Sequence, residues 1–454
     1  MTAIARPRAA SGPFGQALAV LAVASAWAIH LPLGSKYLVY LLCAVLAMSW
    51  LVKSGQVRAA LRWPALAWPL ALWLVLVLSA SWSTAPPDAQ WSHAWHYGRW
   101  LFMPLIALAC PAEAARRGLR HFAVASTAVG VLMIADHLHH LPASALWSTT
   151  LGAMGNQRIA VSLLLALSAA LALTLALDAR HGRRQRLAWL LAAATTALAV
   201  TLQDRRTGMV ALPVLLAALA LSRQGIAAGA SHDNTVDEDA PQDTPSLSST
   251  PPPGSPTTTP PSRRRAWPRS AAALAGVALL AGLTWQQSDT VRARFAEGLA
   301  ELQTYAPTGV VATSWGMRLR MIEVTLEMVR DKPVLGHGLG SWLSQWQRRA
   351  RGGGSLLEEQ LTPHNEYLLI TEQAGVVGLA LWLAVLATAL ASAWRAGRAG
   401  DAALLVWTAI AWSALFNVVV RDAKFALPLL MLAALAVAAG RDAQAEAKPP
   451  HAAA

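Results

Sequence analysis

The sequence of 454 residues contains little charge: only 13% of its residues are Asp, Glu, Lys or Arg, whereas soluble domains average about 25%. More than half of the chain, 55%, is hydrophobic, and the mean hydropathy is +0.40. Long uncharged runs alternate with short basic clusters, a pattern that indicates an all-α polytopic membrane protein. Ten-residue segments of alternating polarity are absent, which argues against a transmembrane barrel.

Cysteine and paired acidic motifs are also scarce. Cys43 and Cys110 both fall in apolar segments, so we predict no disulfide. The carboxylates expected on the non-cytoplasmic side are scattered, and the His137–His140 cluster matches no usual ligand spacing. We therefore predict no metal site and no cofactor. The net charge of +13 comes from short loops between apolar runs, so membrane topology explains it better than nucleic-acid binding.

About twelve transmembrane helices are predicted. With the N-terminus in the cytoplasm, cytoplasmic segments hold 21 Lys and Arg against 7 in the short external segments. Because cytoplasmic loops are enriched in these residues, both termini are predicted to be cytoplasmic. The expected spans lie near residues 14–33, 37–53, 63–81, 99–113, 119–136, 159–177, 187–203, 208–222, 270–285, 365–394, 402–420 and 425–439. The tenth is too long for one span and is expected to enter the bilayer near Val376.

Two long inter-span stretches divide the chain. The first is rich in Pro, Ser, Thr and Asp and is predicted to be a disordered cytoplasmic linker. The second shows helical spacing of apolar residues and is predicted to be a small periplasmic helical domain, with Trp82, Trp91, Trp95 and Trp100 as an aromatic belt nearby. The predicted divisions are 1–225 (helices 1–8), 226–266 (linker), 267–285 (helix 9), 286–364 (periplasmic domain), 365–440 (helices 10–12) and 441–454 (cytoplasmic tail).

Arginines at the external face are candidates for binding an anion. Arg205 and Arg206 lie at the outer lip of two spans, against the charge rule, although interface anchoring is the alternative reading. Arg318 is predicted in the first turn of a helix that begins after Thr313 or Ser314, where the helix dipole also attracts anions. Arg320 competes with it for the same role.

His364 is the candidate proton acceptor. Thr362 is predicted to cap a helix, with Pro363 at its first position and His364 in its first turn. The helix dipole would then lower the pKa of His364 and favour a neutral imidazole. Asn365 and Glu366 are expected to orient the ring or bind sugar, whereas His337, in a glycine-rich turn, is read as structural.

The chain resembles the O-antigen ligase and polymerase superfamily, and most closely the lipopolysaccharide O-antigen ligases. Each of the strings that carry the resemblance is weak alone, but their order and topology are fairly specific. They are Arg206-Thr207-Gly208, then Gly316-Met317-Arg318-Leu319 leading to Pro333-Val334-Leu335-Gly336-His337-Gly338-Leu339-Gly340, and His364-Asn365-Glu366-Tyr367-Leu368 followed by Gly375 and Gly378. A departure is Arg205, where the family often has Ser.

The resemblance implies a fold like that of the membrane glycosyltransferases called GT-C, in the bacterial inner membrane. It implies a glycosyltransferase that moves a glycan from undecaprenyl diphosphate to lipid A–core oligosaccharide at the periplasmic face. The family's arginines and histidine correspond to Arg206, Arg318 and His364, which would be catalytic; Arg205, Arg320, Asn365 and Glu366 are predicted from their positions to bind substrate. The expected reaction is inverting and metal-independent. Alternatives are an O-antigen polymerase, a protein O-oligosaccharyltransferase and, from another class, a transporter or flippase, which should show internal repeats.

Overall fold

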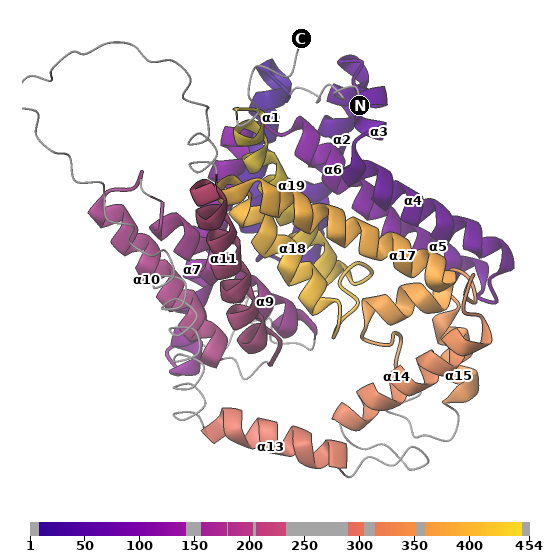
Figure 1. The fold of residues 1–454 in the computed structure, drawn as a ribbon. Helices are drawn as coiled ribbons and strands as arrows, with labels where there is room; N and C mark the ends of the chain where they lie inside the picture. The colour runs from indigo at the N-terminus through magenta and orange to yellow at the C-terminus, as the bar shows by residue number, and fades with distance from the viewer. Residues whose placement is uncertain are drawn as a thin grey trace, which may run out of the picture.

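A computed structural model describes residues 9–141, 156–178, 180–202, 206–232, 289–303, 314–350 and 359–446, and every regular element in these ranges is a helix (Figure 1). The longer helices are α1 (Gly12–Ala28), α2 (Leu33–Lys53), α4 (Pro64–Leu78), α7 (Ala112–His137), α9 (Asn156–Ala176), α10 (Arg183–Leu202), α11 (Arg206–His232), α17 (Glu366–Arg395), α18 (Asp401–Ser413) and α19 (Ala423–Glu446). The shorter ones are α3 (Val57–Leu61), α5 (Pro87–Gly98), α6 (Phe102–Ala109), α13 (Asp289–Gln303), α14 (Ser314–Asp331) and α15 (Trp342–Arg349), with the turns η1 (Ser79–Trp82), η2 (Arg99–Leu101) and η4 (Gly397–Gly400).

Seven of the described helices are long and apolar enough to cross a bilayer, so the chain is a polytopic helical membrane protein. Two expected spans differ from the observed elements. In the run 99–113 the helix α6 is only eight residues long; it continues α5 through η2 and ends before α7 begins at Ala112. The run 402–420 is helical only as far as Ser413, and the following residues form a loop. The expected span 270–285 lies outside the described residues.

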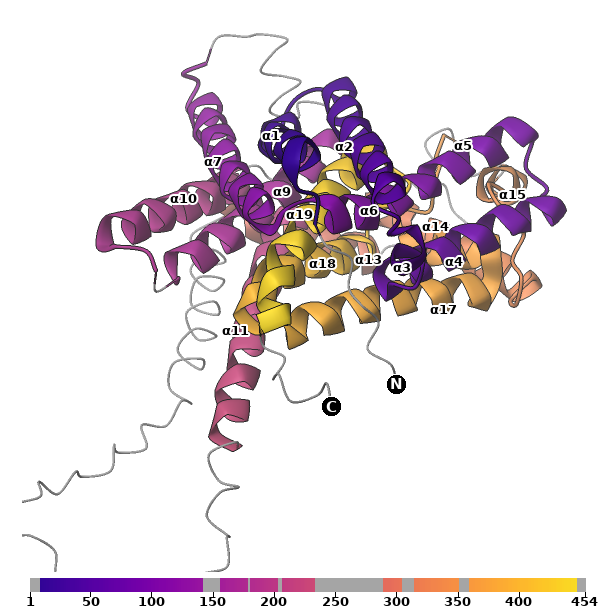
Figure 2. The same cartoon turned by 90° about the horizontal axis from the view of Figure 1, so that it is seen from above.

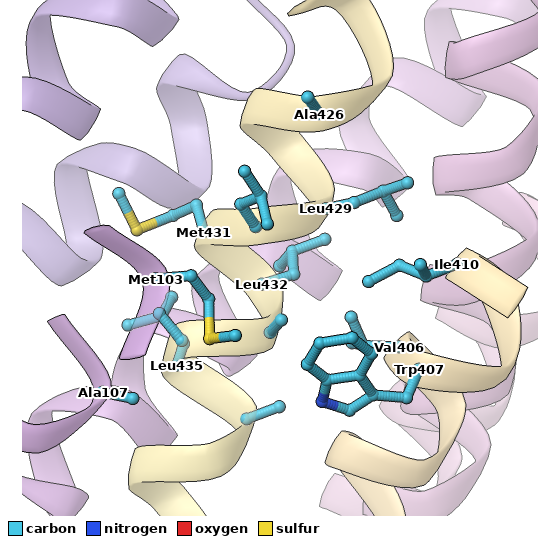
Figure 3. Close-up of a cluster of buried hydrophobic side chains, with 14 of the residues drawn as sticks. Met103, Ala107, Val406, Trp407, Ile410, Ala426, Leu429, Met431, Leu432 and Leu435 are labelled. Atoms are coloured by element: carbon cyan, nitrogen blue, oxygen red, sulfur yellow. The ribbon is translucent and has the colours of Figure 1, made fainter. Parts of the chain in front are cut away.

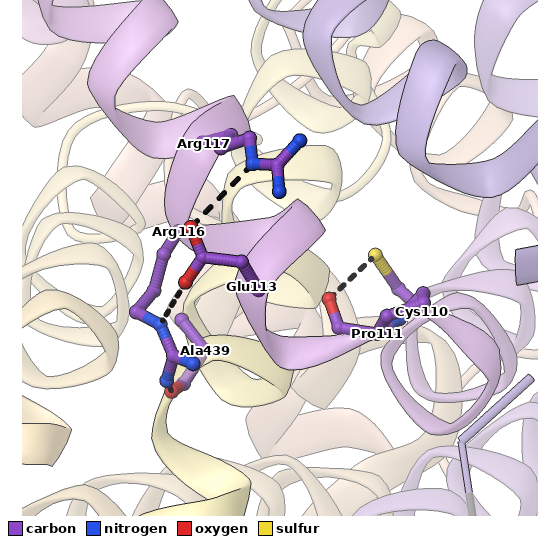
Figure 4. A network of polar contacts seen from close by, with 6 residues as sticks. All are labelled: Cys110, Pro111, Glu113, Arg116, Arg117 and Ala439. Atoms are coloured by element: carbon purple, nitrogen blue, oxygen red, sulfur yellow. Dashed lines mark hydrogen bonds and ion pairs between the residues drawn. The ribbon is translucent and has the colours of Figure 1, made fainter. Parts of the chain in front are cut away.

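One end of the bundle collects chain segments that the charge rule assigns to the cytoplasm. Ala10 donates its backbone N–H to Ala109 O, at 2.9 Å. Arg116, near the start of α7, donates to Glu113 and to Ala439 O of α19, each at 3.1 Å (Figure 4). Arg223 of α11 pairs with Asp401 of α18 at 2.8 Å at the same end. These segments therefore lie at the same end of the bundle, as the charge rule predicts. Which side of the membrane this end faces remains a prediction.

The core between α6, α18 and α19 is built from Leu, Ile, Val, Ala and Met side chains packed around the ring of Trp407 (Figure 3). Alanine-rich faces let these helices approach closely, as is common in membrane bundles. Trp100 belongs to this core: its ring lies 5.2 Å from Trp382 and 6.0 Å from Trp407, and it is buried. Its predicted place in an interfacial belt is therefore wrong, whereas Trp91 and Trp95 on α5 are exposed.

The helices predicted for the second long stretch are present as α13, α14 and α15 (Figure 1). α14 and α15 pack on each other and on α17, and α4 runs beside α17 in both views (Figure 2). Their assignment to the periplasm remains a prediction. The first long stretch was expected to be unstructured from residue 226, but α11 continues to His232; its remainder, 233–266, lies outside the described residues.

Candidate functional site

The site is organised around a break in α17. Gly375 has φ +62° and ψ −160°, so the helix is interrupted one residue before Val376, where the sequence predicts entry into the bilayer. A Cβ at Gly375 would overlap the backbone of Val334. The turn that follows α14 therefore lies directly against the break, and glycine is required because only it tolerates both the contact and the positive φ.

Main-chain hydrogen bonds hold this turn to α17. His337 N donates to Glu372 O at 2.7 Å and Gly338 N donates to Gln373 O at 3.0 Å. The bonded residues are 35 positions apart, so the glycine-rich string and the helix segment between Leu368 and Gly375 of the last string form one unit. His337 is buried and its Nε2 donates to Met328 O at 2.9 Å, which agrees with its structural reading.

The first half of α17 begins differently from the prediction. Asn365, not Thr362, is the N-cap: its side-chain oxygen accepts from Leu368 N at 3.0 Å, and its amide donates to Leu415 O at 3.1 Å. His364 therefore lies just before the helix, in a left-handed conformation with φ +49°. The predicted cap was wrong because Asn satisfies a free N–H of the first turn and is held there by a distant loop.

His364 is half-buried, and its Nε2 lies 3.3 Å from Gln360 Oε1. Burial lowers the pKa of His364, the charge of Arg318 lowers it further, and Asp422 opposes them. The predicted direction is confirmed, but the main cause is desolvation rather than the helix dipole. A neutral imidazole results, which can accept a proton.

Arg318 is the arginine of α14 whose charge reaches His364. It lies one residue beyond the predicted first turn, since α14 begins at Ser314, and it is half-buried. Arg320 instead pairs with Glu323 on its own helix, at 2.9 Å. The structure thus distinguishes the two candidate anion-binding arginines. The charge of Arg318 acts on the His364 imidazole, whereas Arg320 forms an ion pair within α14.

Glu366 anchors the loop 414–422 onto α17. Its carboxylate is fully buried and accepts from Tyr97 Oη at 3.0 Å and from Val420 N at 2.8 Å, while Glu366 N donates to Ala414 O at 2.8 Å. Asn365 and Glu366 were expected to orient the ring or bind sugar. Both side chains instead make internal bonds, and sugar binding by them stays a prediction.

Arg421, His93, Tyr97 and Gln373 are not among the site residues that the sequence predicts. The structure brings these four together: Arg421 Nε lies 3.1 Å from His93 Nε2, and His93 Nδ1 lies 3.1 Å from Gln373 Oε1. The only available signal was the presence of polar residues in otherwise apolar helices. No spacing rule connects α5 with residues more than 270 positions later.

Arg206 is the first residue of α11. At the other end of this part of α11, Arg223 pairs with Asp401, the first residue of α18, and the two helices pack together. They are therefore antiparallel, so the start of α11 points to the end of the bundle where α18 finishes and His364 lies. A Cβ at Gly208 would collide with Ser162, which fixes a close crossing with α9. Arg205 lies outside the described residues.

Within the described ranges, no group of three or more His, Cys, Asp and Glu side chains is arranged to hold a metal ion. The charged groups that surround His364 are instead Arg318 and Asp422. The arrangement offers one neutral proton acceptor next to a cation at the end of a membrane-embedded bundle. Such an arrangement can accept a proton while it binds an anionic group.

The fold and site therefore define a multi-pass membrane protein with a basic polar site at one end of its helices. Residues 190–383 match a family model described as O-antigen ligase, and this range includes Arg206, Arg318 and His364. The predicted resemblance to this family is confirmed over the matched range. No curated protein matches the chain.

Proposed function

We propose that this protein is a glycosyltransferase that moves a glycan from undecaprenyl diphosphate to lipid A–core oligosaccharide at the periplasmic face of the bacterial inner membrane. The observation that carries the proposal is a half-buried His364 just before α17 on which the charge of Arg318 of α14 acts, both within the range that matches the O-antigen ligase family. A proton acceptor and a cation are the two groups that a transfer with a diphosphate leaving group needs.

In the proposed reaction, His364 takes the proton from an acceptor hydroxyl as its oxygen attacks the anomeric carbon. With the amide placed as observed, Gln360 Oε1 accepts from His364 Nε2–H, which leaves Nδ1 as the proton acceptor. The bond from the anomeric carbon to the diphosphate oxygen breaks, and its electron pair leaves with the diphosphate. Attack from the opposite face inverts the configuration.

The leaving diphosphate gains negative charge, which Arg318 and Arg206 would stabilise by charge-assisted hydrogen bonds. Arg205 and Arg320 are proposed as further binding residues for the lipid-linked donor. No metal ion is assigned to this step, because the arginines supply the positive charge.

The test is reconstitution of the purified full-length protein with undecaprenyl-diphosphate-linked glycan and one acceptor at a time. Attachment of the glycan to lipid A–core oligosaccharide is the expected result. Extension of a second lipid-linked glycan would identify a polymerase, and modification of a protein hydroxyl would identify a protein oligosaccharyltransferase. Glycan movement across vesicles without any covalent product would overturn the transferase proposal.

A further inference from the structure

The side chain of Arg421 is bonded to a buried histidine. Its Nε donates to His93 Nε2 at 3.1 Å, so one edge of the guanidinium is fixed by a residue of α5. The two terminal amino groups have no hydrogen-bond partner among the residues that the structure describes, and the side chain is half-buried. A guanidinium fixed through Nε can still present a pair of N–H donors to an oxyanion.

The hydrogen bonds behind Arg421 have only one consistent direction. Arginine can only donate, so His93 Nε2 accepts and Nδ1 carries the proton of the neutral ring. Nδ1–H then donates to Gln373 Oε1 at 3.1 Å, and the same oxygen accepts from Gly340 N at 2.8 Å. Burial, followed by the charge of Arg421, lowers the pKa of His93 to about 3, so the ring stays neutral near pH 7.

The residues that hold Arg421 are themselves fixed in the fold. His93 is 7% exposed and Gln373 is fully buried, so neither exchanges its partners with water. Gln373 lies in the half of α17 that precedes the Gly375 break, and Gly340 ends the turn that docks there. A simple interfacial anchor needs no such support, because a snorkelling arginine is held by water and headgroups.

Arg421 also lies on the loop 414–422, which is bonded to Asn365 and Glu366, the two residues after His364. Val420 N, one residue before it, donates to the Glu366 carboxylate at 2.8 Å. Asp422, one residue after it, is the group whose charge opposes that of Arg318 at His364. The backbone carbonyl of Arg421 accepts from the buried Arg99 side chain at 2.8 Å, which fixes the end of the loop.

We propose that Arg421 is a third cation of the site, which binds a phosphate group of a substrate, and that His93 and Gln373 are positioning residues that aim its guanidinium. The inference rests on the proposed function, since it places a phosphate in the same site. The phosphate can belong to the lipid-linked donor or to a phosphorylated acceptor; both present the same oxyanion.

The experiment measures binding rather than turnover, with the purified full-length protein in detergent. Undecaprenyl diphosphate is titrated in one arm and phosphorylated lipid A–core oligosaccharide in the other, and the dissociation constants are read by native mass spectrometry. The variants are Arg421→Ala, Arg421→Lys, His93→Phe and His93→Gln, and the control is Arg330→Ala, an exposed arginine near the end of α14. Thermal unfolding confirms that each variant is folded.

Arg421→Ala is expected to weaken binding by about ten- to a hundredfold in at least one arm, the usual effect of losing hydrogen bonds to a charged group. Arg421→Lys should recover part of the loss, since it keeps the charge without the fork. His93→Phe should weaken the same arm several-fold, whereas His93→Gln should restore it, because an amide can accept from Arg421 and donate to Gln373. Arg330→Ala should bind like the wild type.

The ligand whose binding the Arg421 variants weaken identifies the molecule that carries the phosphate. Wild-type affinity of Arg421→Ala in both arms overturns the inference, and equal affinities of His93→Phe and wild type overturn the positioning role. If Arg318→Ala loses the diphosphate while Arg421→Ala keeps both ligands, only this inference fails. If the wild-type protein binds neither ligand, the proposed function fails with it.

Discussion

Val376 N donates a hydrogen bond of 2.8 Å to Pro333 O, across the break in α17. In an uninterrupted helix this N–H would bond to Glu372 O, four residues earlier. Glu372 O instead accepts from His337 N, at 2.7 Å. The turn after α14 therefore supplies both the donor and the acceptor that the break leaves unpaired, and the break depends on this turn.

Gly375→Ala is expected to dislodge the turn. An added methyl would overlap the Val334 backbone, and the positive φ alone costs ~1–3 kcal/mol for a residue with a side chain. Thermal unfolding in detergent should begin several degrees lower, and transfer activity should be lost. Gly182→Ala is the matched control, because its Cβ would meet no atom within 4 Å. Equal unfolding midpoints for the two variants would contradict the dependence.

Removal of the proposed catalytic groups should strongly slow transfer without unfolding the protein. His364→Ala and Arg318→Ala are each expected to reduce the rate by ~10²–10³, as loss of one stabilising donor does in comparable sites. The measurement is the initial rate with donor and acceptor, beside a thermal unfolding curve for each variant. Arg330→Ala, an exposed arginine on the same helix, should retain full activity. Full activity of either first variant would remove that residue from the mechanism.

The rate should depend on the protonation of His364. Because its pKa lies below the usual value of about 6.5, the imidazole is neutral at pH 7 and the rate should fall only at lower pH. Asp422→Asn removes the charge that raises this pKa, so the acid limb should move to lower pH. Arg318→Gln removes a charge that lowers it, so the limb of its residual activity should move to higher pH.

A profile of the rate from pH 5 to pH 8 for the three proteins checks this prediction. Asparagine is a good N-cap like aspartate, so Asp422→Asn should keep the start of α19, where Asp422 Oδ1 accepts from Lys424 N at 3.0 Å. Identical acid limbs in all three proteins would show that another group limits the rate.

Glu366→Gln separates an anchoring role from sugar binding. The buried carboxylate accepts from Tyr97 and Val420, and its replacement by a neutral amide should lower the free energy of unfolding by ~1–3 kcal/mol. Combination with Tyr97→Phe should cost less than the sum of the two single changes, because they share one bond. The control is Glu327→Gln, an exposed carboxylate of α14. A raised KM for the glycan donor with unchanged stability would favour sugar binding instead.

Chelation is expected to leave the reaction unchanged, since arginines neutralise the leaving diphosphate in the proposed mechanism. The initial rate is measured with and without EDTA, after dialysis of the protein and both substrates. Strong inhibition that added divalent cation reverses would contradict the metal-free mechanism.

Local patterns predicted much of the helical fold because each depends on neighbouring residues. The apolar runs predicted α2, α7 and α10 closely, and the glycine at 375 lies where the long tenth segment was expected to reach the bilayer. The helix containing Arg318 was placed to within one residue of its turn. Charge and position predicted the candidate residues, and two of the strings that carry the family resemblance are joined by hydrogen bonds.

Contacts between distant segments explain the errors. The apolar run 414–420 looks like the end of a span, but its backbone pairs with Glu366, about fifty residues earlier. Trp100 looks like an interfacial residue, but Trp382 and Trp407 enclose it. Arg421 looks like an anchor until α5 places His93 behind it. No periodicity in the sequence encodes such partners.

The break at Gly375 also sets a depth in the membrane. The uninterrupted part of α17, residues 376–395, is about 30 Å long at 1.5 Å per residue, which equals the hydrocarbon thickness of a bilayer. A lipid whose tail lies alongside this part would have its phosphates level with the kink. The break would thereby mark one boundary of the hydrocarbon core, with residues 366–374 and the turn that docks on them lying beyond it.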